Sequence, residues 1–275
     1  MTVHVDDERS LAYEEYGDSN GVPVVFLHGT PGSRRLGRLL ESAATARGIR
    51  VLAPDRPGYG QSIPWPERSV RDAEAFVTPV LDDVGVETAG LVAFSGGAPD
   101  ALATAATRPD RIDRVDVVSG ATPPEISEET PALQRLLARL ATATPPLLRG
   151  LFRGQAWLAS RLDPSFVLAQ YTDDAESIPD AAAETVRADF VEAFSGSGRG
   201  AVTEFRNTAR DWEIAFENIE AEVRLWHGEA DTNVPIADVR RLEQRLPNAR
   251  LHALDDADHL QALLRSIPDV LDERR

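Results

Sequence analysis

The sequence contains no cysteine and no lysine. Without cysteine there is neither a disulfide framework nor a thiolate metal site. The chain also lacks an apolar run long enough to span a bilayer, and its first residues lack the basic-then-apolar pattern of a signal peptide. We therefore expect a cytoplasmic protein with no membrane partner.

The charge is strongly one-sided. There are 45 acidic residues against 29 basic ones, all of them arginine, and the formal net charge is −16. The carboxylates are dispersed along the chain rather than gathered into a tail. This pattern is typical of halophilic proteins, in which counterions relieve self-repulsion, and we favour it over an acidic surface for a basic partner. No basic patch is visible, so the sequence predicts no nucleic-acid partner.

Apolar runs alternate with helical patterns over most of the 275 residues, a length that suits one domain with an insertion. After a short N-terminal hairpin we predict strands at 23–27, 49–53, 89–94, 115–118, 223–226 and 251–254. Helices are predicted at 33–47, at 69–84 with a kink or break at Pro79, up to 107, at 235–246 and from 259 onward. Strands that alternate with helices indicate an α/β fold with a mostly parallel sheet.

Residues 121–218 interrupt this alternation. No strand pattern is found there, whereas helical periodicity returns repeatedly between prolines and the break at Ser195-Gly-Ser-Gly198. We therefore interpret residues 1–120 and 219–275 as an α/β core and 121–218 as an all-helical insertion.

Residues 89–99 carry the strongest chemical signal. An apolar run ends at Ser95, Gly96 and Gly97 follow, and an alanine-rich helical segment begins. So tight a turn holds its apical residue in a strained conformation with an exposed side chain, while the glycines let strand and helix pass closely. The pattern predicts a nucleophile elbow with Ser95 as the nucleophile, although Ala93 stands where the usual G-x-S-x-G motif has its first glycine.

A carboxylate and a histidine follow two later strands. Asp231 comes after the strand at 223–226, and His259 after the strand at 251–254. Catalytic groups in open α/β sheets gather at the carboxyl edge, so these residues can meet Ser95 there. A serine hydroxyl needs a histidine to take its proton, and that histidine needs a carboxylate to fix its tautomer. We favour Asp231 over the other nearby carboxylates, which are Glu229, Asp255, Asp256 and Asp258.

Five short motifs resemble, in their order along the chain, those of the α/β-hydrolase superfamily, in its esterase-like branch with a helical cap. They are His28-Gly-Thr-Pro-Gly32, Asp55-Arg-Pro-Gly-Tyr-Gly60, Phe94-Ser-Gly-Gly97, His227-Gly-Glu-Ala-Asp231 and Asp258-His259. The resemblance implies an eight-stranded, mostly parallel sheet flanked by helices, with residues 121–218 as a cap inserted after the sixth core strand. It also implies an oxyanion hole made by the backbone N–H groups of Thr30 and Gly96.

The implied activity is that of a serine hydrolase without cofactor or metal, acting on a small-molecule substrate. We expect a small or medium carboxylic ester, an acyl-enzyme on Ser95, proton transfer by His259 and orientation of that histidine by Asp231. Phe94 and Tyr59 are candidates for the wall of the substrate pocket.

Several alternatives stay open. Epoxide hydrolases and haloalkane dehalogenases resemble this chain but use aspartate at the elbow, and Ser95 argues against both. Carbon–carbon bond hydrolases, lactonases and cofactor-free haloperoxidase-like proteins share a serine elbow. A non-catalytic protein that binds a small ligand is the competing class, and the sequence leaves open whether the protein is a monomer or a homodimer.

Overall fold

The computed structural model describes residues 1–127 and 132–272 and contains one eight-stranded sheet, in the order β1-β2-β4-β3-β5-β6-β7-β8. Only the pairs β1–β2 and β2–β4 are antiparallel. The strands are β1 (Thr2–His4), β2 (Ser10–Gly17), β3 (Val22–Leu27), β4 (Ile49–Pro54), β5 (Ala89–Phe94), β6 (Ile112–Val118), β7 (Glu222–Gly228) and β8 (Ala249–Leu254). The predicted mostly parallel sheet of eight strands is confirmed.

The helices fall into two groups. Those that connect or follow the core strands are η1 (Arg34–Leu40), α1 (Glu41–Arg47), η2 (Val70–Ala73), α2 (Glu74–Asp83), η3 (Ser95–Gly97), α3 (Ala98–Thr107), α9 (Ile236–Arg245) and α10 (His259–Leu271). Those between β6 and β7 are α4 (Ala132–Ala143), α5 (Pro145–Ala159), α6 (Ser165–Leu168), η4 (Ala175–Ser177), α7 (Asp180–Ala193), α8 (Arg199–Asn207) and η5 (Phe216–Asn218).

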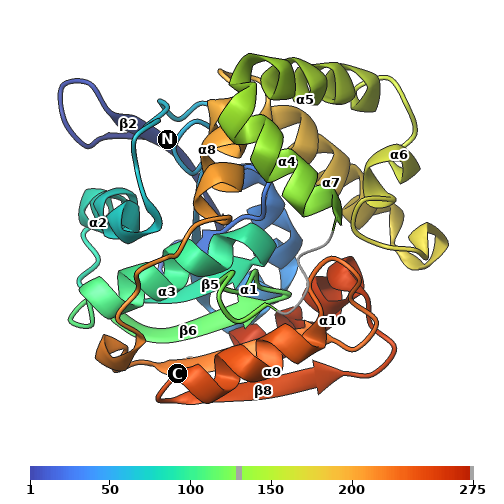
Figure 1. The fold of residues 1–275 in the computed structure, drawn as a ribbon. Helices are drawn as coiled ribbons and strands as arrows, with labels where there is room; N and C mark the ends of the chain where they lie inside the picture. The colour runs from blue at the N-terminus through green and yellow to red at the C-terminus, as the bar shows by residue number, and fades with distance from the viewer. Residues whose placement is uncertain (128–131, 273–275) are drawn as a thin grey trace.

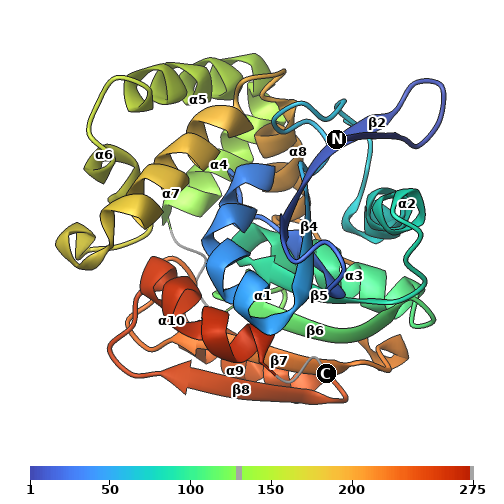
Figure 2. The same ribbon diagram turned by 180° about the vertical axis from the view of Figure 1, so that it is seen from behind.

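Strand β3 shows how the sequence builds a three-layer core. Its side chains alternate, so that Val25 and Leu27 join one apolar cluster while Val24 and Phe26 join another on the opposite face. Helices α2, α3 and α9 cover the first face (Figure 1), and α1 and α10 cover the second (Figure 2). Burial of each such side chain contributes about 1.5–3 kcal/mol, which explains why β3 is a continuous apolar run.

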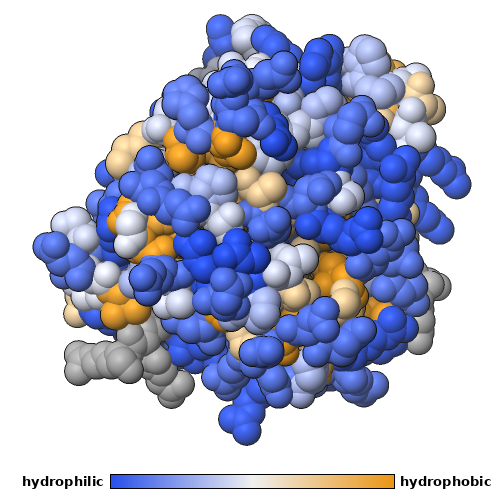
Figure 3. Space-filling view, turned by 90° about the vertical axis from the view of Figure 1, so that its left-hand side faces the viewer, coloured by the Kyte–Doolittle hydropathy of each residue, from blue (hydrophilic) through white to orange (hydrophobic). Residues whose placement is uncertain are grey.

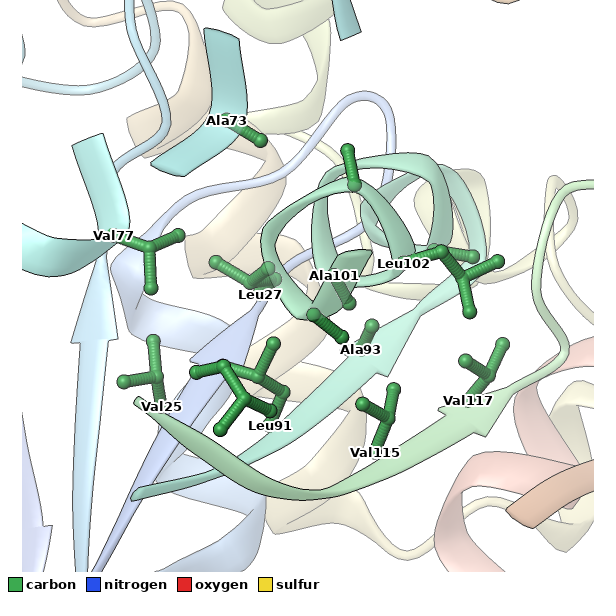
Figure 4. Close-up of a cluster of buried hydrophobic side chains, with 14 of the residues drawn as sticks. Val25, Leu27, Ala73, Val77, Leu91, Ala93, Ala101, Leu102, Val115 and Val117 are labelled. Atoms are coloured by element: carbon green, nitrogen blue, oxygen red, sulfur yellow. The ribbon is translucent and has the colours of Figure 1, made fainter. Parts of the chain in front are cut away.

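The face under α3 is packed with small and branched side chains. Figure 4 shows residues of β3, β5 and β6 pointing toward Ala101 and Leu102 of this helix. Ala93 is among them, completely buried, with the turn at the end of β5 only two residues away. A Cβ is therefore accommodated at the position where the usual elbow motif has glycine.

The helix predicted at 69–84 is present, but Pro79 lies inside α2 and does not divide it. The change from 3₁₀ to α-helix occurs instead between Ala73 and Glu74. Packing explains the difference, because the residues on both sides of Pro79 are buried against the sheet and hold the helix together; they are Phe76, Val77, Val80 and Leu81.

Helices α4 to α8 lie together on one side of the sheet, at the top of Figure 1. In the described residues between 121 and 218 there is no strand, in agreement with the helical pattern of the sequence. The division at 120/121 and 218/219 stays a prediction. Residues 128–131 of the predicted cap and 273–275 of the predicted core lie outside the described residues.

Among the helices of the described residues, none has both the length and the apolar character needed to cross a bilayer. The face shown in Figure 3 is mainly hydrophilic, with small and separate apolar patches.

One buried carboxylate joins this helical layer to the core. Asp189 of α7 accepts hydrogen bonds from the backbone N–H (2.7 Å) and the hydroxyl (2.8 Å) of Ser33, the residue that caps η1. No arginine pairs with Asp189 among the described ion pairs, and burial raises its pKa to about 8, against the hydrogen bonds from Ser33, which lower it.

We therefore expect Asp189 to make stability fall as pH rises. Between 3.8, the ordinary pKa of an aspartate, and about 8, the folded protein holds a proton that the unfolded chain has lost, so the free energy of unfolding decreases with pH in this window. Asp189→Asn keeps an oxygen for Ser33 and has no proton to lose. Calorimetry at pH 5 and pH 8 should show a smaller fall in Tm for Asp189→Asn than for the wild type, and equal falls would contradict the raised pKa.

Candidate active site

Ser95 lies at the turn between β5 and α3, in a backbone conformation that only a strained turn imposes. Its φ is +51°, in the left-handed region that residues with a side chain seldom adopt. A Cβ added to Gly97 would lie 2.5 Å from the carbonyl oxygen of Leu27, so only glycine lets the turn pass so close to β3. Ser95 is only partly buried and lines a cavity, as an elbow requires.

His259 and Asp231 meet at the same edge of the sheet, after β8 and β7. His259 Nδ1 and Asp231 Oδ2 are 2.8 Å apart, and both side chains are buried. An aspartate accepts only from an N–H, so Nδ1 carries the proton and Nε2 is left with a free lone pair. His259 lines the same cavity as Ser95. No hydrogen bond joins Ser95 and His259 in the described residues, and such contacts are often long before a substrate binds.

The loop after β7 holds Asp231 in place. Its Oδ1 accepts from the backbone N–H groups of Asn233 (2.9 Å) and Val234 (3.0 Å), which leaves Oδ2 for the histidine. Burial by itself raises the pKa of Asp231, but His259, His227 and the Val234 amide together lower it below its ordinary value. The carboxylate is therefore ionised, the state in which it can orient and stabilise an imidazolium.

His227 supports this carboxylate from a completely buried position. Its Nε2 lies 2.8 Å from the carbonyl oxygen of Val234 and 3.4 Å from Asp231 Oδ2, so it carries a proton there. Burial lowers the pKa of His227, which keeps the ring neutral. The rival carboxylate Asp258 serves another purpose, because it caps α10 by accepting from the backbone N–H of Gln261.

The residues Thr30 and Gly96 pack closely against each other beside the turn at Ser95. An ideal Cβ on Gly96 would lie 3.1 Å from Thr30 N and would overlap the Thr30 hydroxyl, so any larger residue would displace the Thr30 loop. Both residues line the cavity beside Ser95. No hydrogen bond to either amide is made within the described part of the chain. Two such free donors can bind an oxygen that gains negative charge.

The cavity has a volume of about 630 Å³ and lies between the carboxyl edge of the sheet and the helical layer. Ser95 and His259 are part of its wall on the core side. The helical layer adds mainly apolar side chains, among them Leu133, Leu137, Phe152, Tyr171 and Phe205. This arrangement can bind an apolar group next to the serine hydroxyl.

Tyr59 and Phe94 do not line the cavity, which corrects the expectation that they form its wall. Tyr59 is completely buried, with its ring edge-on to that of His28 at 5.0 Å, and Phe94 packs against His259 at 5.0 Å. Phe94 is the last residue of β5 and Tyr59 lies in the loop after β4, and both rings are buried in the same apolar cluster. The adjacent motif residue Asp55 is also buried and accepts from the Gln61 backbone N–H (2.9 Å), which fixes its own loop.

Several residues of the site carried no signal in the sequence. Tyr171 lies parallel to His259 at 6.3 Å, its hydroxyl donates to the carbonyl oxygen of Pro31, and its own carbonyl accepts from the Leu260 N–H. Glu204 of α8 accepts from the Thr30 hydroxyl at 3.3 Å. Both belong to the helical layer, where no motif marks them; the only hint for Glu204 is an acidic residue within an otherwise small and apolar run.

Within residues 1–127 and 132–272, no group of three or more His, Asp or Glu side chains is arranged to hold a metal ion. Among the chemical groups at the cavity are the Ser95 hydroxyl and the His259 imidazole, which is paired with the Asp231 carboxylate.

Comparisons with known proteins identify the fold family. A family model described as alpha/beta hydrolase fold matches residues 22–265. The chain is 27% identical over 271 residues to a 2-hydroxy-6-oxononadienedioate/2-hydroxy-6-oxononatrienedioate hydrolase of Cupriavidus pinatubonensis, a match that covers 90% of this chain and 86% of that protein. It is 32% identical over 153 residues to a haloalkane dehalogenase of Mycolicibacterium paratuberculosis, which covers 53% of this chain, and here the chain spans only 50% of the relative's length.

Solved structures show the same fold over the whole chain. An enol-lactonase from Burkholderia xenovorans LB400 superposes with a TM-score of 0.74 at 21% identity, covering 98% of this chain and 100% of the other. An esterase from Rhodococcus sp. ECU1013 superposes with a TM-score of 0.72 at 19% identity, covering 100% and 99%. At these identities the likeness concerns the fold alone. Together with the family model, it shows that the chain belongs to the α/β-hydrolase fold family.

Proposed function

We propose that the protein is a serine hydrolase that cleaves a small or medium carboxylic ester through an acyl-enzyme on Ser95. The observation that carries this proposal is the 2.8 Å contact between His259 and Asp231 in a cavity that Ser95 also lines. A nucleophile, a base and an orienting carboxylate are the three groups that acyl transfer through serine needs.

The proposed reaction begins with proton transfer from the Ser95 hydroxyl to His259 Nε2, as the serine oxygen attacks the acyl carbonyl. Asp231 stabilises the imidazolium that forms, and the imidazolium then gives its proton to the leaving alcohol. A water molecule, activated by the same imidazole, releases the acid from Ser95.

The tetrahedral intermediates carry an oxyanion, for which the amides of Thr30 and Gly96 are the proposed donors. The loss of one such donor costs about 3–4 kcal/mol of transition-state stabilisation in enzymes of this kind. The apolar wall from Leu133, Leu137 and Phe152 suits an acyl chain, and the cavity volume of about 630 Å³ limits its length.

A second candidate is hydrolysis of a carbon–carbon bond. It is favoured by the relative from Cupriavidus pinatubonensis, which is 27% identical over 90% of this chain. The two candidates share the serine, the histidine and the aspartate, so the substrate decides between them. If the protein cleaves a 2-hydroxy-6-oxo-dienoic acid much faster than any ester, that result would favour this second candidate.

Two assays on the wild type test the proposal. In the first, p-nitrophenyl esters of increasing acyl length are expected to be hydrolysed with an optimum at short to medium chains, because the cavity is apolar and of limited size. In the second, a fluorophosphonate is expected to modify the folded protein at the peptide that contains Ser95, as mapped by mass spectrometry, and not the denatured protein. A folded wild type that neither reacts with the probe nor hydrolyses any ester would contradict the proposal and favour a ligand-binding protein.

A further inference from the structure

The loop that carries Thr30 is in contact with a buried arginine, Arg56, whose partners include a peptide carbonyl of that loop. Arg56 has no exposed surface. Its Nη2 donates to the carbonyl oxygen of Gly29 at 2.8 Å and to the Thr30 hydroxyl at 2.9 Å. Its Nη1 donates to the carbonyl oxygen of Gly96 at 3.0 Å. One guanidinium therefore contacts both segments that supply the proposed oxyanion donors.

The contact with Gly29 has an electronic as well as a geometric consequence. The Gly29 carbonyl and the Thr30 N–H belong to the same planar peptide group, so an atom that fixes one fixes the other. A cation hydrogen-bonded to the carbonyl draws electron density through the peptide and makes its N–H a stronger donor. The site is buried, so neither water nor salt screens this effect.

The charge of Arg56 is balanced inside the protein. Asp100 of α3 accepts from Nη1 at 2.8 Å, and Glu204 of α8 accepts from the same nitrogen, so Gly96, Asp100 and Glu204 share its two N–H groups. Arg68 is the fourth member of this buried cluster, with Nη1 3.5 Å from Asp100 and Nη2 in contact with Glu204. Two arginines and two carboxylates leave the cluster neutral, which is the condition for keeping charges away from water.

Arginine suits this position better than lysine would. Its planar fork presents separate N–H groups to Gly29 and Gly96, which lie on different loops, whereas an ammonium is a single point charge on a flexible stem. Glu204 comes from the helical layer and Asp100 from α3, so both the helical layer and the core hold the guanidinium.

We propose that Arg56 is a positioning residue of the oxyanion hole, which orients and polarises the Gly29–Thr30 peptide for a negatively charged substrate oxygen. This role rests on the proposed serine hydrolase function. It goes beyond that function because the hydrogen-bond strength of the Thr30 N–H would depend on the buried Arg56 and, through Arg56, on Glu204 of the helical layer.

The test measures the second-order rate of fluorophosphonate labelling together with kcat and KM for a p-nitrophenyl ester. Loss of a whole oxyanion donor costs about 10²- to 10³-fold in kcat. The Arg56→Met variant keeps the donor N–H but loses the group that orients and polarises it. We therefore expect kcat to fall by about 10- to 100-fold. The labelling rate should fall by a similar factor, and KM should change little, because the oxyanion contact strengthens only as the charge develops.

Arg68→Met is the matched control. It removes the same charge from the same cluster, yet among the described contacts Arg68 touches neither Gly29, Thr30 nor Gly96. A second variant, Arg56→Met with Glu204→Gln, restores the neutral cluster without restoring the peptide contacts. We expect the Arg68 variant to label at nearly the wild-type rate per folded molecule, and the double variant to stay slow even though its Tm recovers.

The outcomes are distinct. Recovery of the labelling rate in the double variant would show that Arg56 serves charge balance alone and would overturn the role. So would an equal loss in Arg68→Met. If Arg56→Met does not fold, the double variant carries the comparison. A wild type that is not labelled at Ser95 would overturn the proposed function and this role with it, whereas labelling of the wild type and Arg56→Met at equal rates would overturn only the role of Arg56.

Discussion

Ser95→Ala is expected to lower kcat by about 10⁶-fold on any ester that the wild type hydrolyses. Removal of the nucleophile of a serine triad costs about this much, and the small residual rate comes from the oxyanion hole and from binding. The variant should fold normally, because alanine has the same backbone requirement at φ +51° and the hydroxyl makes no hydrogen bond in the described residues. The measurement is kcat with the folded state verified by circular dichroism.

His259→Ala should lose about as much as Ser95→Ala, and the double variant should lose no more than either. The two side chains act together in one step, the attack of the serine oxygen. Once either is removed this step is lost, so removal of the other causes no further loss of kcat. The matched control is His227→Gln, which replaces the other buried histidine near Asp231 and should retain measurable turnover. Additive losses would argue that His259 is not the base for Ser95.

Each member of the proposed triad carries a local signal in the sequence. The turn at Ser95 follows an all-apolar strand and precedes two glycines, and at Gly97 the atoms that exclude a side chain are backbone atoms of Leu27 and His28. Asp231 and His259 each follow a strand, and a parallel sheet brings such positions to one edge. Strand periodicity and turn chemistry therefore place all three residues at one edge of the sheet, where the structure also has them, and their catalytic roles stay a prediction.

The residues that support the site could not be predicted in this way. Glu204 meets Arg56 across 148 residues of sequence, and Asp189 meets Ser33 across 156. Glu204 and Asp189 are ordinary acidic residues on helices, and only the docking of the helical layer on the core brings them to Arg56 and Ser33. For the same reason the sequence motifs point to Tyr59, which is completely buried, whereas residues of α4 and α5 form the wall of the cavity.

Asp231→Asn is expected to lower kcat by about 10⁴-fold while the fold is retained. The amide oxygen of asparagine can still accept from Asn233 and Val234, as Oδ1 does now at 2.9 and 3.0 Å. Its NH₂ group then faces His259 Nδ1, which must become an acceptor. The imidazole proton moves to Nε2, so the nitrogen that faces the cavity can no longer take the serine proton. A wrong tautomer of this kind costs about 10⁴-fold in a serine triad.

Glu229→Gln tests the assignment of the carboxylate, because Glu229 is a rival in the same loop. Its side chain is exposed and lies 3.6 Å from Arg240, with His259 in contact with Asp231 instead. We expect its kcat to equal that of the wild type. A large loss in Glu229→Gln with little loss in Asp231→Asn would mean that another carboxylate orients the histidine during turnover. Equal and small losses of kcat in Glu229→Gln and Asp231→Asn would mean that His259 keeps its tautomer without a carboxylate. The 2.8 Å contact with Asp231 would then hold the loop and contribute little to the chemistry.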